Sequence, residues 1–331
     1  MNTIINSTAT YIPKNKISSQ EMEQRISEIF PEISFGILEE MTGIKTRYFV
    51  SEGEYSSDLA IKASEKCFEK SEIKKQDIDL LIFASASQDI IEPATGNIVQ
   101  KGLGLTCPIF DVKNACNSFL NGIDIADSFI KSGKYKNILV CSGETPSKVI
   151  QYKIFNRLDL KKYFAGFTLG DAGTAMILTV TKENIGIKKT YFLSDGNSWE
   201  LGTIMGGGSR FPHIDKNYFT GEPAKLKDKF KSIGTKEFEN GLSELGWKKN
   251  EITKFFVHQV TMSNFEYMQD IIGVEKEKFE IILPNYGNIA SCCMPFAFDN
   301  FCKNNILHKG DKFVFIGFAS GFSYGLVFYE V

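Results

Sequence analysis

Short apolar runs alternate with longer amphipathic runs along the chain. Two amphipathic segments, residues 58–70 and 235–245, have the spacing of helices. Four apolar runs have the length and composition of buried β-strands: residues 80–84 (LLIFA), 137–142 (NILVCS), 255–259 (FFVHQ) and 312–318 (KFVFIGF). Continuous apolar strands that alternate with helices indicate sheets covered on both faces. The pattern therefore predicts an α/β protein.

The same pattern occurs twice. Residues 73–87 and 247–261 both read Lys-Lys, a polar residue, an acid, Ile and an apolar strand, and they start 174 residues apart (247 − 73). Two further pairs of segments match at 175 (309 − 134) and 172 (282 − 110) residues. A repeat at nearly one spacing indicates a duplicated architecture. We expect two halves, residues 1–183 and 184–331, packed as an α/β/α/β/α sandwich of five layers.

Composition narrows the class of protein. With 38 basic and 40 acidic residues the net charge is -2, which gives no electrostatic basis for binding nucleic acid or an anionic membrane. No apolar run reaches the roughly 18 residues of a membrane span, and the N-terminus does not resemble a secretory signal. The seven cysteines are odd in number and lack C-x-x-C spacing, which argues against a disulfide framework and a metal site. We expect a cytoplasmic protein.

Cys116 stands between a strand-like run and a helix-like run. The run FDV at 110–112 precedes it, and an amphipathic segment with helical spacing follows over residues 117–133. At the first turn of a helix, unpaired N–H groups and the helix dipole would stabilise a thiolate and lower the pKa of Cys116. The alternative is an inert cysteine that packs in the core.

Two further polar residues accompany this cysteine. His258 ends an apolar strand, and Asn288 follows Gly287 before a helical segment. The duplication places Cys116 and Asn288 at equivalent strand-to-helix corners, with His258 at a strand end beside them. A nucleophile, a general acid/base and a hydrogen-bond donor suit acyl transfer. The glycine-rich segment 317–325 is a source of backbone N–H groups for an oxyanion hole.

Motifs along nearly the whole chain resemble those of the thiolase-superfamily condensing enzymes, most closely ketoacyl-acyl-carrier-protein synthase III. They are TGI at 42–44 with Arg47, FDV-x-x-AC at 110–116, LGDAGTA at 169–175, SDG at 194–196, HQ at 258–259 and YGN at 286–288. The resemblance implies a thiolase fold and a homodimer. It also implies substrates carried on acyl carrier protein or coenzyme A, with no cofactor of the enzyme's own.

The resemblance also implies a role for each site residue. Cys116 would take the acyl group as a thioester. His258 and Asn288 would bind the carbonyl of a second thioester and stabilise the carbanion or enolate formed in a Claisen condensation. The backbone N–H groups of Cys116 and Ser320 would hold the oxyanion.

The chain departs from the family where coenzyme A is held. Housekeeping members clasp coenzyme A with a Trp and two Arg, and the aligned positions here carry Ile37, Met41 and Tyr163. Those members also have an Asn and an Arg shortly after the HQ motif. The segment VTMSN at 260–264 does not carry them at the expected positions. A donor bound to a carrier protein is therefore favoured over coenzyme A.

The stretch DIIEPAT at 89–95 is similar to one in the head-to-head condensing enzymes of olefin and dialkylresorcinol-type pathways. In those enzymes the glutamate acts as a base from across the dimer, which would be the role of Glu92. The alternative is that Glu92 is an acid before Pro93 that the dipole of the following helix stabilises.

Three other functions are alternatives to condensation. A papain-like hydrolase requires a C-G-[SA]-C-[WY] motif, which the surroundings of Cys116 do not match. An acyltransferase on the same fold would pass the acyl group to an alcohol or amine. A non-catalytic carrier-protein partner would be expected to lack the nucleophile. We expect a condensing enzyme of a specialised fatty-acid or polyketide-type pathway.

Overall fold

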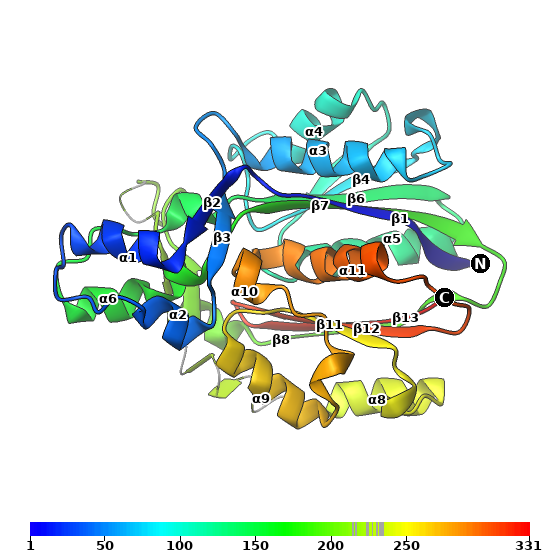
Figure 1. Ribbon diagram of the computed structural model, residues 1–331. Helices are drawn as coiled ribbons and strands as arrows, with labels where there is room; N and C mark the ends of the chain where they lie inside the picture. The colour runs from blue at the N-terminus through cyan, green and yellow to red at the C-terminus, as the bar shows by residue number, and fades with distance from the viewer. Residues whose placement is uncertain (214, 216, 223–224, 227, 230, 232–234) are drawn as a thin grey trace.

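The computed structural model describes residues 1–331 except 214, 216, 223–224, 227, 230 and 232–234, and its layers follow the predicted order (Figure 1). Two helices cover the outer face of one sheet, two lie between the sheets, and two cover the outer face of the second sheet. In that order they are α3 (Ser56–Glu69), α4 (Thr95–Leu103), α5 (Ser118–Lys131), α11 (Cys293–Asn304), α8 (Lys236–Leu245) and α9 (Met262–Ile272). The predicted five-layer α/β/α/β/α sandwich is confirmed.

The two sheets repeat one arrangement. The first sheet contains, in spatial order, β1 (Asn2–Tyr11), β7 (Ala172–Thr181), β6 (Asn137–Glu144), β4 (Leu80–Ala84) and β5 (Ile109–Val112). The second contains β8 (Gly186–Ser194), β13 (Ser323–Glu330), β12 (Lys312–Ala319) and β11 (Lys254–Val257). Strand β4 is parallel to β6, as β11 is to β12. The pairs β6–β7 and β7–β1 of the first sheet are antiparallel, as are β12–β13 and β13–β8 of the second.

The duplication is incomplete at one edge. Strand β5 pairs in parallel with β4, but beside β11 the described residues hold only an isolated parallel bridge between Phe255 and Phe279. The strand expected at Ile282, opposite the run before Cys116, is not present there. Instead Ile282 precedes a four-residue helix, α10 (Leu283–Tyr286), with Pro284 in its first turn. Proline lacks the N–H that a ladder requires, which favours this helical start over a strand.

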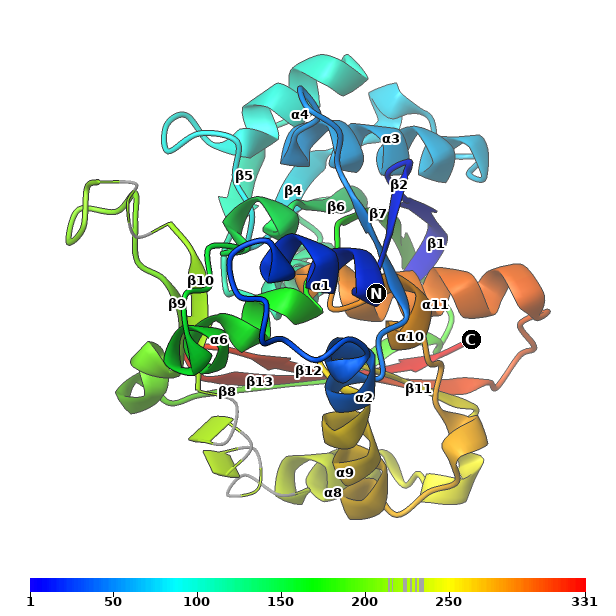
Figure 2. The ribbon, with the colours of Figure 1, turned by 60° about the vertical axis from the view of Figure 1, so that its left-hand side comes forward.

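Smaller elements gather at one end of the sandwich. Helices α1, α2 and α6 lie at the left of Figure 1 and come forward in Figure 2. The additional elements are α1 (Ser19–Ser27), α2 (Ile37–Thr42), α6 (Arg157–Tyr163), the hairpin β2 (Asn15–Ser18) with β3 (Thr46–Phe49), and the pair β9 (Gly202–Ile204) with β10 (Phe219–Gly221). No helix in the described residues combines the length and apolarity that a bilayer span requires.

The position of the central helices between two sheets explains their apolar composition. Helix α11 reads CMPFAFDNFCKN, and most of its residues are buried because sheets cover it on both sides. The ring of Phe298 on α11 lies 5.3 Å from that of Phe256 on β11 and 5.4 Å from that of Phe315 on β12. Contacts of this kind fix α11, and hence the turn before it, against the second sheet.

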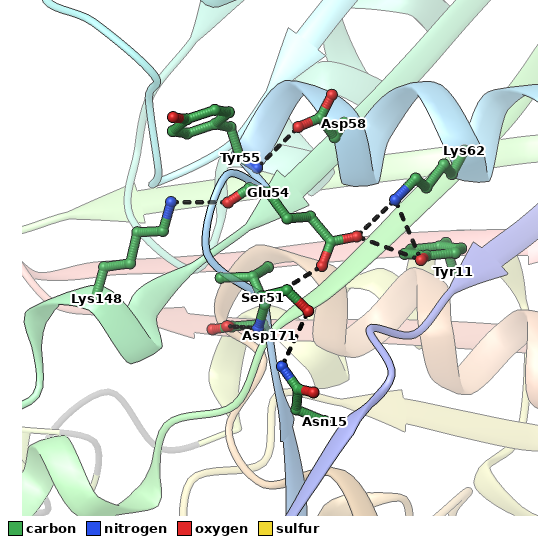
Figure 3. Close-up of polar contacts among 10 residues, drawn as sticks. Tyr11, Asn15, Ser51, Glu54, Tyr55, Asp58, Lys62, Lys148 and Asp171 are labelled. Atoms are coloured by element: carbon green, nitrogen blue, oxygen red, sulfur yellow. Dashed lines mark hydrogen bonds and ion pairs between the residues drawn. The ribbon is translucent and has the colours of Figure 1, made fainter.

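Polar side chains fasten the connection between β3 and α3 to the first sheet (Figure 3). Glu54 accepts hydrogen bonds from Lys62 at 2.6 Å and Tyr11 at 3.3 Å. The buried Asp171, from the LGDAGTA motif, accepts hydrogen bonds from the backbone of Val50 at 2.8 Å and of Ser147 at 2.9 Å. Burial raises the pKa of Asp171 to about 7, although these donors oppose the rise. The cluster ties the turn at Asp171 to the ends of β3 and β6.

Candidate active site

Cys116 lies in the turn between β5 and α5, and the second half contains a matching turn. Ala115, just before it, has a φ of 46°, in the left-handed region that is strained for alanine. Ala290 has a φ of 48° and lies three residues before the start of α11, as Ala115 does before α5. The counterpart of Cys116 is therefore Ser291. The expectation that Asn288 occupies the equivalent corner is wrong, because Asn288 lies three residues earlier, after α10.

The turn that carries Cys116 is anchored on the second sheet. The buried Asn117 donates a hydrogen bond from Nδ2 to the Ser323 hydroxyl at 2.9 Å. Its side chain packs on Gly317 of β12, where a Cβ atom would come within 1.9 Å of Asn117 Oδ1. A glycine at 317 thus leaves the space for Asn117. This contact fixes the residue after Cys116 in both position and orientation.

The environment of Cys116 opposes ionisation of the thiol. The residue is half-buried, and desolvation raises its pKa above the usual range. The charges of Glu144 and Cys293 raise it further, while the N–H group of Cys116 itself lowers it. The expected lowering by the helix terminus is therefore wrong. Cys116 stands two residues before the first helical residue, Ser118, and burial and a nearby carboxylate decide the direction.

His258 and Asn288 meet directly. The two atoms His258 Nε2 and Asn288 Oδ1 lie 3.2 Å apart, and both residues are buried. Asn288 Oδ1 also accepts a hydrogen bond from the backbone N–H of Ala290 at 3.1 Å. The backbone N–H of His258 donates to the carbonyl of Ile316 at 2.8 Å, which fixes the histidine at the end of β11. The structure thus brings together two of the residues that the sequence selected.

These contacts define the protonation of the pair. Desolvation lowers the pKa of His258 to about 4, so the imidazole is neutral at pH 7. Because Asn288 Oδ1 already accepts from Ala290, it is the acceptor for the Nε2–H of His258. Within the described chain, Asn288 Nδ2 donates to no other residue. The Asn288 amide N–H can therefore be directed at a carbonyl oxygen, and the Nε2–H of His258 can join it by exchanging its acceptor, Asn288 Oδ1, for that oxygen.

The lowered pKa of His258 predicts a stability change with pH. The unfolded histidine binds a proton below about 6.5 and the folded one only below about 4, so the free energy of unfolding should fall as pH drops through this window. Between pH 7.5 and 4.5 wild type should lose about 2 to 3 kcal/mol more than His258→Gln in urea unfolding. Equal losses in the two proteins would contradict the neutral, buried imidazole.

Gln259 and Cys293 connect the histidine to the rest of the site. The Gln259 carboxamide oxygen accepts the backbone N–H groups of Ile282 and Leu283, both at 3.0 Å, and so ties the end of β11 to the segment that leads to Asn288. The Gln259 backbone N–H lies 3.3 Å from the sulfur of Cys293. Cys293 is the first residue of α11, so this contact joins the start of α11 to the strand end at His258.

Ser320 lies in the tight turn between β12 and β13. Backbone hydrogen bonds of 2.8 and 3.2 Å between Asp195 and Phe322 hold this turn to the SDG motif. The Ser320 side chain packs against Gly202, where an added Cβ would come within 2.8 Å of Ser320 Cβ. Its backbone N–H donates to no other group in the described residues, as an oxyanion donor requires.

Glu92 lies apart from the other candidates. It is exposed in the connection between β4 and α4, next to Ile91, which is 72% exposed. The first N–H groups of α4, those of Thr95 and Gly96, donate to the side chain of Asp111 at 2.8 Å each. Asp111, and not Glu92, is therefore the acceptor for these two N–H groups.

A largely apolar cavity of about 670 Å³ opens beside the HQ motif. It is lined by the connection between α1 and α2, by α2 and α6, by Val260 and Thr261 directly after Gln259, and by the first turn of α9. Of the three positions aligned with the coenzyme A clasp, Ile37 and Met41 line this cavity, and Tyr163 is not among its described lining residues. Three charged side chains line it too: Glu32, Arg157 and Lys161. Sequence reasoning missed these, although the run RLDLKK at 157–162 places basic residues next to Tyr163.

Comparisons with known proteins find one family in both halves of the chain. The family model described as 3-oxoacyl-[acyl-carrier-protein] synthase III matches residues 110–196, and its C-terminal companion matches residues 242–331. The beta-ketoacyl-[acyl-carrier-protein] synthase III of Clostridium perfringens strain SM101 is 31% identical, over 95% of each chain. That of Clostridium novyi strain NT is also 31% identical, over 98% of this chain and 97% of the relative.

Solved structures of Xanthomonas campestris OleA share the fold. One, a Cys→Ser variant with bound lauric acid and lauroyl-CoA, has a TM-score of 0.91 at 24% identity and covers 100% of this chain and 99% of that one. Another, a Glu→Ala variant, has a TM-score of 0.90 at 24% identity, with coverage of 100% and 98%. The fold is the thiolase fold. The chain belongs to the 3-oxoacyl-[acyl-carrier-protein] synthase III family of condensing enzymes.

Proposed function

We propose that this condensing enzyme joins two acyl thioesters head to head in a specialised lipid or polyketide-type pathway. The observation that carries the proposal is the site at the centre of the duplicated fold. The half-buried Cys116 lies in the strained turn before α5, and the buried His258 and Asn288 form a neutral, hydrogen-bonded pair.

In the first step Cys116 attacks the carbonyl of an acyl thioester. The new bond joins the cysteine sulfur to the acyl carbon, the thioester bond to the carrier breaks, and the thiol proton leaves with the carrier sulfur. The backbone N–H groups of Cys116 and Ser320 hold the oxyanion of the tetrahedral intermediate. The free N–H of Ser320 supports this assignment.

In the second step a base removes an α-proton from a second acyl thioester. His258 and Asn288 donate hydrogen bonds to its carbonyl oxygen, which stabilises the enolate. The enolate carbon attacks the acyl carbon on Cys116, the sulfur–carbon bond breaks, and a β-ketoacyl thioester is released while the cysteine sulfur regains a proton from the protonated base. Both partners supply only their own atoms, so no cofactor enters the reaction.

We assign the base to Glu92 of a second copy of this chain in a homodimer. Strand β5 is the edge of the first sheet, and its apolar residues Ile109, Phe110 and Val112 are only partly buried. Such an edge is suited to pairing with another copy. The connection that carries Glu92 lies next to it, between β4 and α4, with Ile90 and Ile91 exposed. A partner would bury these residues and bring Glu92 toward the neighbouring site.

Residue spacing supports the assignment. In solved variants of OleA the substituted cysteine and histidine are 142 residues apart, as are Cys116 and His258 (258 − 116). The glutamate substituted in another OleA structure precedes that cysteine by 26 residues, and Glu92 precedes Cys116 by 24 (116 − 92).

We further propose that the acyl donor arrives on an acyl carrier protein in the cytoplasm. The apolar cavity beside the HQ motif is within the size range of ligand sites and suits a pantetheine arm. Ile37 and Met41 stand where an aromatic and basic clasp for coenzyme A would be needed, while Arg157 and Lys161 suit a phosphate. All seven cysteines are free, which fits a reducing compartment.

Product analysis tests the proposed reaction. Wild-type enzyme supplied with one long-chain acyl thioester, on carrier protein or coenzyme A, should form a β-ketoacyl thioester that contains two acyl chains. No malonyl thioester is added, and mass spectrometry identifies the product. A product that forms only with a malonyl thioester, with release of CO₂, would refute head-to-head condensation and leave the family's decarboxylative reaction.

A further inference from the structure

Arg47 is a fully buried arginine that follows the TGI motif and has no part in the reaction above. Within the described part of the chain its guanidinium forms no ion pair, and it makes two hydrogen bonds. Nη1 donates to the Ser19 hydroxyl and Nη2 to the backbone carbonyl of Phe167, both at 3.1 Å. A charge buried without an opposite charge beside it is costly, and departures of this kind are typical of functional sites.

Phe167 leads into a short segment, residues 168–170, that binds the backbone of Asn288. The N–H of Asn288 donates to the carbonyl of Thr168 at 2.7 Å, and the carbonyl of Asn288 accepts from the N–H of Gly170 at 3.0 Å. Both backbone polar groups of Asn288 are therefore bound by this segment. The arginine holds the carbonyl directly before it.

The stem of Arg47 packs against the same place. Arg47 belongs to β3, which lies beside α10 (Figure 1). A Cβ atom added at Gly287 would come within 3.3 Å of Arg47 Cβ, and one added at Gly170 within 3.2 Å. The hydroxyl of Thr46 also donates to the carbonyl of Asn285 at 3.0 Å. Strand β3 thus contacts the chain on both sides of the bridge that holds the asparagine.

The position of this backbone determines where the Asn288 amide points. Its Oδ1 lies 3.1 Å from the N–H of Ala290 and 3.2 Å from Nε2 of His258, which leaves Nδ2 to face a substrate carbonyl. Thr168 also lines the apolar cavity, so one segment joins the cavity wall to Asn288. A displacement on the order of 1 Å in such a group costs up to about 10²-fold in rate.

We propose that Arg47 is a positioning residue for condensation. Through residues 167–170 it holds the backbone of Asn288, so that the amide of this residue meets the carbonyl of the second acyl thioester. The inference rests on the proposed role of Asn288 and names a residue that this role requires. The described contacts of Arg47 do not include Cys116, so acylation does not depend on it.

The test measures the two steps separately in Arg47→Met, which keeps the stem and removes the guanidinium. Acylation of Cys116 by a long-chain acyl thioester should proceed at the wild-type rate. The kcat for condensation should fall by about 10- to 100-fold, with the KM of the second thioester nearly unchanged. Arg47→Lys keeps the charge but lacks the planar fork that reaches both acceptors, and it should lie between Arg47→Met and wild type.

A double-mutant cycle with Asn288→Ala separates positioning from general damage to the fold. Asn288→Ala alone should slow condensation by about 10²- to 10³-fold, the effect of a lost oxyanion donor. Adding Arg47→Met should slow it no further, because the amide through which Arg47 acts is already absent. Additive effects, an equal loss of acylation, or wild-type condensation in a folded Arg47→Met protein would each overturn the proposal.

Arg25→Met is the matched control. Arg25 is an exposed arginine of α1 that lies 5.6 Å from the ring centre of Tyr152, and its described contacts do not reach residues 167–170. Both steps should remain unchanged in this variant, and an effect equal to that of Arg47→Met would refute the specific role of Arg47. If Arg47→Met does not fold, the same cycle with Arg47→Lys decides. Failure of the proposed function would appear separately, as wild-type condensation in Asn288→Ala.

Discussion

Cys116→Ala should form no acyl adduct when incubated with an acyl thioester, whereas wild type should gain the mass of one acyl group per chain. The alanine lacks the nucleophile that splits the reaction into two steps, so product formation should fall by on the order of 10³-fold or more. Intact-mass spectrometry measures the adduct, and treatment with hydroxylamine should release it as expected of a thioester.

Cys293→Ala provides the control for this experiment. Cys293 is another buried cysteine of the site, yet its sulfur contacts the backbone at Gln259 and Val257. We expect this variant to keep the adduct. An adduct of the same mass that survives in Cys116→Ala, or its loss only in Cys293→Ala, would move the nucleophile away from Cys116.

Glu92→Gln should keep acylation of Cys116 and slow condensation by about 10² to 10⁴-fold, the range of a lost general base. The substitution leaves the helix α4 terminus intact because Asp111 binds its N–H groups. Mass spectrometry of a single turnover measures the acylation step. Chromatography of the product measures the condensation step. A variant with unchanged product formation would exclude Glu92 as the base.

Mixed dimers decide whether Glu92 acts across the interface. Each homodimer, Glu92→Gln or Cys116→Ala, should be impaired. A dimer with one subunit of each kind contains one site that combines an intact Cys116 with the partner subunit's Glu92, so co-expression should restore activity. Lack of restoration in purified mixed dimers would place Glu92 in its own subunit's site. Glu275→Gln, which changes an exposed glutamate of the second half, serves as a neutral control.

Much of the fold was predictable because buried strands and helices have distinct periods. The apolar runs at 80–84 and 312–318 became β4 and β12, and their repetition predicted two like sheets. The prediction failed at residues 282–288, where the sequence around Pro284 forms α10. A match of seven residues cannot separate a strand from one helical turn, because both can follow an apolar run.

The chemistry of the site was harder to foresee. His258 and Asn288 stood out as polar residues at the ends of apolar segments, and they lie in contact. Glu144 also ends an apolar strand, but its partner Ser291 is 147 residues away in the chain, so no local pattern marks the pair. The direction of the Cys116 pKa shift depends on that distant carboxylate and on burial, which only the folded chain defines.

The missing counterpart of β5 bears on how copies of this protein assemble. The first sheet ends at β5, while in the described residues the second ends at β11 with only the bridge at Phe279 beside it. Two copies that pair through β5 use the same surface on both sides, which is an isologous contact. Such a contact buries the edge strand of each copy, so the assembly stops at a dimer. If both halves had this strand, each molecule would have two edge strands able to pair with other copies, and the assembly could extend as an open filament.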